Sequence, residues 1–300
     1  MRLVTIMFLL MCISVTYAET GARVGLSFLK IGVDARAVSM GNAFTAVANN
    51  ASATYWNPAG LSTSTHNSVI LMHNSWLQGI NQEFGAIQFI NGVHNIAVSL
   101  NMINISGIEL RDETASENPI GETQALNMYL SLAYATKLDG NWHIGLQIKY
   151  LYEKYYLYAA DGFALDLGIK KENILQDLSW GFVVQNFGKM STLNKEATKL
   201  PLGLRTGLSY LLPLQILEAR PLIAVDINYI LNDMTSMNLG VEVPLMGYAD
   251  IRLGYVLGRE SQTITTGFGM NYDIFHIAYA FVPYNYDLGN SHRFSLIVDF

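Results

Sequence analysis

From about Asn67 to the C-terminus, apolar and other residues alternate along the chain with a period of two. One face of each stretch is large and apolar, whereas the other carries glycine, alanine, serine and isolated charges, as in strands that separate two environments. The alternation is clearest around Leu132, Ile148, Leu167, Leu208, Leu253 and Tyr279. The pattern predicts an all-β chain with two unlike faces.

About fourteen such segments can be counted, each near the roughly 9–11 residues that a tilted transmembrane strand needs. An even number is usual for single-chain bacterial barrels. The approximate centres lie at Leu71, Ile87, Val98, Leu132, Ile148, Leu167, Phe182, Leu208, Ile227, Gly240, Leu253, Phe268, Tyr279 and Ile297.

The composition places this alternation in a membrane. Hydrophobic residues make up 51% of the chain and charged residues 14%, against roughly 25% charged residues in a typical soluble domain. After the N-terminal residues no apolar run approaches the roughly 20 residues of a spanning helix. Only helices and closed barrels satisfy all backbone hydrogen bonds in lipid. Tyrosine and phenylalanine near the segment ends also suit interfacial girdles, which favours a transmembrane antiparallel β-barrel over a soluble sandwich.

The connections alternate in length and thereby orient the barrel. Asn91-Gly92, Asp139-Gly140-Asn141 and Tyr272-Asp273 read as tight turns, which we expect at the periplasmic rim together with both termini. The longer connections, at 105–124, 187–200 and 283–291, are expected on the outside.

Residues 1–18 have the features of a cleavable export signal. Arg2 precedes an apolar core of about twelve residues, and small residues at the −3 and −1 positions favour cleavage after Ala18. Cys12 is the only cysteine, so the mature chain would contain no disulfide and no thiol chemistry. Without Arg2 the chain has 17 basic and 24 acidic residues, a net charge of −7, which gives no indication of nucleic-acid binding. The expected location is the outer membrane.

Residues 19–66 lack the sustained alternation and are rich in alanine, glycine and asparagine. Their large apolar side chains, such as Phe28, Phe44 and Trp56, argue for packing rather than disorder. Because a barrel of this size otherwise leaves an open channel, we expect this segment to form an N-terminal plug within a barrel formed by residues 67–300.

Three runs in this segment carry a family resemblance: Phe28–Ala37, Met40–Ala43 and Tyr55–Leu61, the last with the sequence Tyr-Trp-Asn-Pro-Ala-Gly-Leu. Their order and spacing resemble the N-terminal signature of the PorV/PorQ family, and residues 287–293 with the final strand are also similar to it. That family is similar in turn to FadL-type transporters, whose plug carries a comparable Asn-Pro-Ala. The resemblance implies a FadL-like fourteen-strand barrel with a plug. Members take part in type IX secretion or surface anchoring, and FadL itself admits hydrophobic ligands.

The charged residues of the small-residue face allow two interpretations. They line a polar path or contact a carboxylate ligand, or they pair with one another and with plug residues such as Asp34 and Arg36 and so seat the plug; the second is favoured. The candidate ligand-binding residues are Phe44, Tyr55, Trp56, Asn57, Pro58, Arg205 and Arg252.

The final strand alternates Phe294, Leu296, Val298 and Phe300, and we interpret it as an assembly signal that the barrel-insertion machinery recognises by strand addition. The six histidines are scattered, so no metal site is expected, and neither an enzyme active site nor a cofactor is predicted.

Two functions remain open. The first is a FadL-like channel or binding protein for hydrophobic small molecules. The alternative is a protein-interaction component of surface secretion or anchoring that docks surface-protein cargo. Besides these, the expected partners are outer-membrane lipid and the barrel-assembly machinery.

Overall fold

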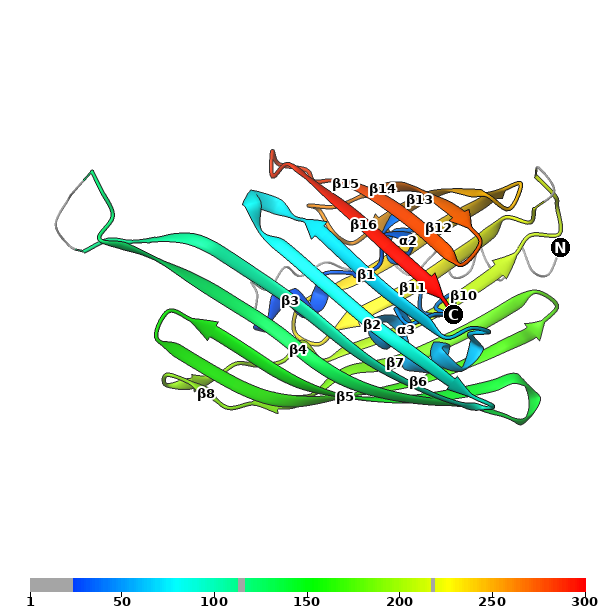
Figure 1. Ribbon diagram of the computed structural model, residues 1–300, viewed down its shortest axis with the longest axis horizontal. Helices are drawn as coiled ribbons and strands as arrows, with labels where there is room; N and C mark the ends of the chain where they lie inside the picture. Colours follow the sequence, from blue (N-terminus) through cyan, green and yellow to red (C-terminus); the bar gives the residue numbers. More distant parts are fainter. Residues whose placement is uncertain (1–23, 113–116, 217–218) are drawn as a thin grey trace.

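Fourteen antiparallel strands close into a barrel in the computed structural model of the chain, which describes residues 24–112, 117–216 and 219–300 (Figure 1). Strands that follow one another along the chain are neighbours around the barrel, and β1 pairs with β16 to close it. The strands are β1 Ser68–Ser75, β2 Asn81–Asn91, β3 His94–Leu110, β4 Gly121–Leu138, β5 Trp142–Tyr155, β6 Tyr158–Leu175, β7 Leu178–Met190, β10 Gly203–Leu211, β11 Leu222–Ile230, β12 Thr235–Leu245, β13 Ala249–Leu257, β14 Ile264–Tyr272, β15 Phe275–Pro283 and β16 Asn290–Asp299.

The predicted barrel is confirmed, and each of the fourteen expected centres lies within a different strand. The longer connections are partly different from the expectation. Both ends of 105–124 are strand, because β3 continues to Leu110 and pairs with β4 from Gly121 onward. This hairpin extends well beyond the rest of the barrel in Figure 1. Residues 187–200 likewise contain the end of β7 and a short hairpin of β8 Thr192–Leu193 and β9 Glu196–Ala197.

The two ends of the barrel are distinct, and we name them by their connections. The turn rim carries the short connections at 92–93, 139–141 (η4, Asp139–Asn141) and 273–274, together with the start of β1 and Phe300. The loop rim carries the β3–β4 hairpin end and the connections at 76–80 (containing η3, Leu77–Gly79), 191–202, 231–234, 258–263 and 284–289. The turn rim has one long connection that the alternation did not predict, residues 212–221 between β10 and β11.

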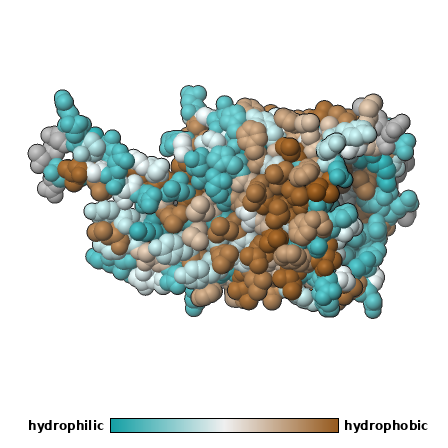
Figure 2. Space-filling view, viewed as in Figure 1, coloured by the Kyte–Doolittle hydropathy of each residue, from teal (hydrophilic) through white to brown (hydrophobic). Residues whose placement is uncertain are grey.

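The outer face of the wall is apolar. On β4, Leu130 and Leu132 are about half exposed, whereas Ser131 and Ala133, which alternate with them, are buried. Figure 2 shows the apolar residues gathered around the middle of the wall, with hydrophilic residues towards both ends. This is the surface of a strand barrel in lipid, with the smaller and polar residues facing inward. Among the described residues, no helix is long and apolar enough to cross a membrane.

Residues 24–66, here called the inner segment, run through the barrel from one rim to the other. The nitrogen of Gly25 donates to Lys199 of a loop-rim connection at 2.9 Å, and Ser62 lies 2.8 Å from His143 near the turn rim. Its short helices are η1 Ser27–Lys30, α2 Ala35–Ser39, α3 Ala53–Trp56 and η2 Pro58–Thr63. Helix α2 packs against β13–β16 and η2 against β3–β6, so the segment lies inside the wall. The predicted signal peptide, residues 1–18, lies outside the described residues.

Candidate functional site

A carboxylate of the barrel wall holds the inner segment through two ion pairs. Glu242 on β12 accepts from both Nε and Nη2 of Arg36 at 2.7 Å, and from Nε of Arg252 on β13 at 2.6 Å. Arg252 also pairs with Asp250 at 2.7 Å. Such two-pronged pairs are directional as well as strong. They hold α2 in one position against β12 and β13.

The start of α2 has its own cap. The side chain of Asp34 accepts from the backbone nitrogen of Arg36 at 3.0 Å and from the hydroxyl of Ser52 at 3.1 Å. Burial raises the pKa of the Asp34 carboxyl, while the Arg36 backbone hydrogen bond and charge act in the opposite direction. Asp34 has a φ of 65°, and these contacts hold that left-handed backbone, which is unfavourable for most residues.

Two further wall residues bond to the backbone of the inner segment. One oxygen of Asp226 on β11 accepts from the nitrogens of Phe44 and Thr45 at 2.9 and 2.8 Å. Lys170 on β6 has the opposite charge, and its Nζ donates to the backbone oxygen of Ala48 at 3.0 Å. A carboxylate therefore satisfies backbone donors and an ammonium group satisfies a backbone acceptor, which lowers the cost of burying both charges.

Asn57 and Pro58 form a fixed turn within the inner segment. The Asn57 amide donates to the oxygens of Thr45 and Ile169 at 3.1 and 3.2 Å and accepts from the nitrogen of Ala59 at 3.2 Å. Asn57 is fully buried, and Pro58 begins η2. All three hydrogen bonds are made to the protein backbone. In this conformation the Asn57 side chain therefore supports the turn and offers no polar atom to a ligand.

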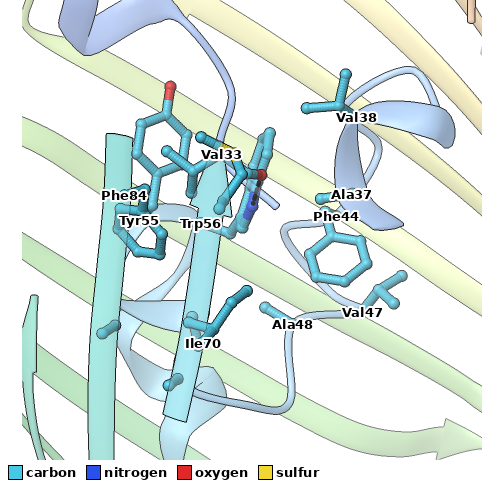
Figure 3. Close-up of a cluster of buried hydrophobic side chains, with 14 of the residues drawn as sticks. Val33, Ala37, Val38, Phe44, Val47, Ala48, Tyr55, Trp56, Ile70 and Phe84 are labelled. Carbon is cyan, nitrogen blue, oxygen red and sulfur yellow. Dashed lines mark hydrogen bonds between the residues drawn. The ribbon is translucent and has the colours of Figure 1, made fainter. Parts of the chain in front are cut away.

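An aromatic cluster lies at the middle of the inner segment (Figure 3). The ring of Trp56 contacts Phe44 and Tyr55 edge-on, with centroids 5.9 and 4.9 Å apart. The guanidinium of Arg205 on β10 stands over Trp56 at 5.0 Å and over Tyr55 at 5.9 Å. Because Phe44 and Trp56 have no exposed surface, a ligand reaches them only after the inner segment has moved.

Glycines on the inward face of the wall allow the backbone of the inner segment to approach the wall very closely. A Cβ at Gly254 on β13 would overlap the backbone nitrogen of Gly41, and one at Gly240 on β12 would lie 2.6 Å from the oxygen of Met40. Gly41 itself has a φ of 66°, which glycine adopts without strain. Backbone thus packs directly on backbone, and no larger residue fits between them.

Replacing Gly254 by valine is therefore expected to prevent α2 from seating against β13. Its side chain meets backbone, which cannot yield as a flexible side chain can; overpacking of this kind costs about 1–3 kcal/mol or more. Limited trypsin digestion in detergent should cleave after Lys30 and Arg36 in the variant but not in the unaltered barrel. Gly85→Val on β2, where the nearest atom is 3.5 Å away in the Leu71 side chain, is the matched control. Equal protection of both variants would contradict the close-packing argument.

The wall is irregular where β6 meets β7. The register shifts between Leu165 and Leu167, so that Gln185 and Asn186 both turn inward. The nitrogen of Asn186 donates to Asp166 at 2.8 Å, and Asp166 pairs with Lys149 at 2.6 Å. A β-bulge that turns two polar residues inward interrupts the ladder at this point. The bulge lies beside the aromatic cluster, since the Gln185 amide donates to the backbone oxygen of Tyr55 at 2.5 Å.

The structure thus brings Phe44, Tyr55, Trp56 and Arg205 together, and places Arg252 elsewhere, in the ion pairs with Glu242 and Asp250. Asp34 and Arg36 both lie on the inner segment against the wall. Arg259, which follows β13, was not predicted from the sequence, and Arg293 on β16 was placed on the inward face but not among the candidate ligand-binding residues. A basic residue just beyond a strand end has no alternation to mark it, so only its place in the barrel reveals it.

The final strand pairs with β1 and β15, and its alternating apolar residues Phe294, Leu296 and Val298 face outward, whereas Ile297 faces inward. Phe294, Leu296 and Phe300 are exposed, Val298 is half-buried, and the Phe300 ring contacts Phe89 edge-on at 6.1 Å. The role of this strand as an assembly signal stays a prediction.

Comparison with known proteins agrees with this geometry. The family model of the type IX secretion system protein PorV matches residues 18–169, and the comparison with curated proteins gave no match. Among solved structures, the toluene transporter TbuX of Ralstonia pickettii is similar with a TM-score of 0.63 at 12% identity, over 89% of this chain and 97% of that one. The toluene transporter TodX of Pseudomonas putida gives 0.60 at 12% identity, over 89% and 97%. A Pseudomonas aeruginosa FadL homologue gives 0.58 at 10%, over 89% and 98%. These likenesses show a shared fold.

Proposed function

The chain belongs to the family of the type IX secretion system protein PorV and is an outer-membrane β-barrel, and on that premise we propose that it is a gated channel or binding protein for hydrophobic small molecules. The loop rim faces the outside and the turn rim the periplasm. The inner segment acts as the plug that separates them.

The observation that carries the proposal is the closure of the lumen by a segment that is bonded to the wall but is not part of it. The strands pair only with one another around the barrel, whereas the inner segment is held by side-chain contacts such as Arg36 with Glu242 and Phe44 with Asp226. The segment can therefore shift without opening the barrel. That the fold is shared with toluene transporters supports a small apolar solute.

Gating follows from burial. The aromatic residues that would accept an apolar solute are covered in this state, so passage requires that the inner segment moves away from the wall beside them. The β6–β7 bulge, where Gln185 contacts the segment, supports a path through the wall at that place, because the ladder is already interrupted there.

Uptake of an apolar probe by intact cells tests the proposal. Phenylnaphthylamine is a neutral fluorophore that an intact lipopolysaccharide leaflet excludes, and expression of the unaltered barrel is expected to accelerate its entry. Entry of a small hydrophilic antibiotic should stay unchanged, because the plugged lumen offers no water-filled path. Probe uptake equal to that of cells without the barrel would refute the channel proposal.

The second candidate function, contact with a secreted or surface protein, is favoured by one feature. The β3–β4 hairpin extends past its neighbours (Figure 1) and exposes Ile108 and Ile120. Apolar residues on a projecting hairpin suit a protein contact, in keeping with the family's name. Cross-linking in membranes followed by purification distinguishes the two candidates: a co-purifying protein favours this one, and a co-purifying small apolar molecule favours the channel.

A further inference from the structure

Three arginines lie at one level of the lumen, near the loop rim. Arg205 is the third residue of β10, which begins at that rim; Arg259 follows the end of β13 there; and Arg293 is the fourth residue of β16, which also begins there. Arg205 and Arg293 are only 6% and 2% exposed. Burial raises the pKa of the Tyr55 hydroxyl, and the charges of all three arginines act against that rise. All three guanidinium groups are thus close enough to act on the Tyr55 hydroxyl, and Arg205 also stands over the Tyr55 ring at 5.9 Å.

No carboxylate among the described residues forms an ion pair with any of the three. The other basic side chains of the lumen are paired or bonded: Lys30 with Asp233 at 2.7 Å, Lys149 with Asp166, Arg36 and Arg252 with Glu242, and Lys170 with Ala48. Uncharged amides lie directly opposite two of the arginines, Asn228 opposite Arg205 and Asn74 opposite Arg293, and the carboxylate of Asp226 lies two residues from Asn228 on the same inward face. Asp226 and Asp233 act on Arg205 and Arg259 without forming an ion pair with them, and the Tyr284 hydroxyl bonds to Arg293, so the positive charge of this region is only partly offset.

Individual guanidinium nitrogens there have no partner. Nε of Arg205, Nε of Arg259, and Nε and Nη1 of Arg293 are buried without a hydrogen bond. The face of Arg205 is covered by Trp56, which fixes its plane and leaves its edge free. Burying unpaired donors of charged groups is costly, and like charges held together add to that cost. The other luminal arginines, Arg36 and Arg252, each have a carboxylate partner, whereas these three have none in the described part of the chain.

We propose that Arg205, Arg259 and Arg293 form an oxyanion site at the loop-rim end of the lumen, which binds a phosphate or carboxylate group. The planar guanidinium fork matches the oxygens of both groups. The anion is either free in solution or the head group of an amphiphile. This inference rests on the proposed function in one respect: the site is taken to lie on the path of the ligand from the outside to the plug.

Calorimetry on the purified full-length barrel in a neutral detergent tests the site, with decyl phosphate, decanol and inorganic phosphate as probes. Decyl phosphate is expected to bind about tenfold or more tightly than decanol, because charged hydrogen bonds form only with the phosphate. Inorganic phosphate distinguishes the two sources. If it competes with decyl phosphate, the site takes free oxyanions; if it does not, the anion must be carried by an amphiphile.

Arg259→Gln and the triple variant R205Q/R259Q/R293Q should lose this preference, and decanol binding should not change. The single variant lies beyond the end of β13 and alters no strand pairing, so it remains informative if the triple variant does not fold. Lys195→Gln removes one positive charge from the exposed β8–β9 turn and should keep the preference.

Equal affinity for decyl phosphate and decanol in the unaltered barrel, or the same preference in the folded triple variant, would overturn the site. The channel proposal fails separately. Absent probe uptake in cells with a retained phosphate preference refutes the channel and leaves the site, whereas normal uptake without the preference refutes the site alone.

Discussion

Cells that carry the barrel without residues 19–60 are expected to become permeable to hydrophilic solutes, by about tenfold or more over cells with the intact barrel, because a barrel of this size with an empty lumen holds water. The strands should still close, since their ladder runs unbroken from β1 to β16 and contains no residue of the deleted part. The luminal charges that the segment now contacts, such as Glu242 and Asp226, would then be hydrated.

The measurement is hydrolysis of a hydrophilic β-lactam by a periplasmic enzyme, at equal amounts of barrel in the outer membrane. Heat-modifiable migration on gels shows whether the shortened chain has closed, because a hydrogen-bonded barrel resists detergent until it is boiled. Unchanged permeability of a closed, shortened barrel would mean that the inner segment does not block the lumen, and the gating proposal would lose its basis.

Replacing Glu242 by alanine is expected to destabilise the barrel by about 3–5 kcal/mol, because breaking a buried pair leaves the partner charge uncompensated. Here two partners are stranded, since Arg36 and Arg252 both bond to this carboxylate. Arg252 keeps its ion pair with Asp250, whereas Arg36 keeps a side-chain hydrogen bond to the amide of Asn49 at 3.2 Å but no ion pair. The inner segment should therefore loosen at α2 before the strands separate.

Urea titration in detergent measures the loss of stability, and trypsin cleavage after Arg36 reports the loosening of α2. The control is Glu83→Ala, which removes a carboxylate at the same kind of distance, 2.6 Å from His73, but with both side chains about half exposed. Exposed pairs contribute about 0–1 kcal/mol, so this variant should resemble the unaltered barrel. Equal losses in the two variants would show that Glu242 does not seat the segment.

The strands and their faces could be predicted because the signal is local. Leu130, Ser131 and Leu132 show the alternation within three positions, and in lipid the outward member must be apolar whichever strands lie beside it. Turns such as Asn91-Gly92 were equally readable, since the residues that accept positive φ occur in the turn itself. The extension of β3 to Leu110 was missed, because beyond the membrane nothing requires alternation and only pairing with β4 holds the hairpin.

The sequence by itself determined that this chain forms a fourteen-strand outer-membrane barrel with a small-residue lumen, and it marked the residues facing inward. Which of those residues meet was decided only by the tertiary structure. Arg36 and Glu242 are 206 positions apart, and Arg205, Arg259 and Arg293 come from three separate parts of the wall. Closure of the barrel and the path of the inner segment set these distances, and no local pattern encodes them. The same closure pairs Arg252 with Glu242 and Asp250 but leaves Arg205 without an ion pair, because Asp226, two residues from the ladder partner of Arg205, bonds to the backbone of Phe44 and Thr45 instead.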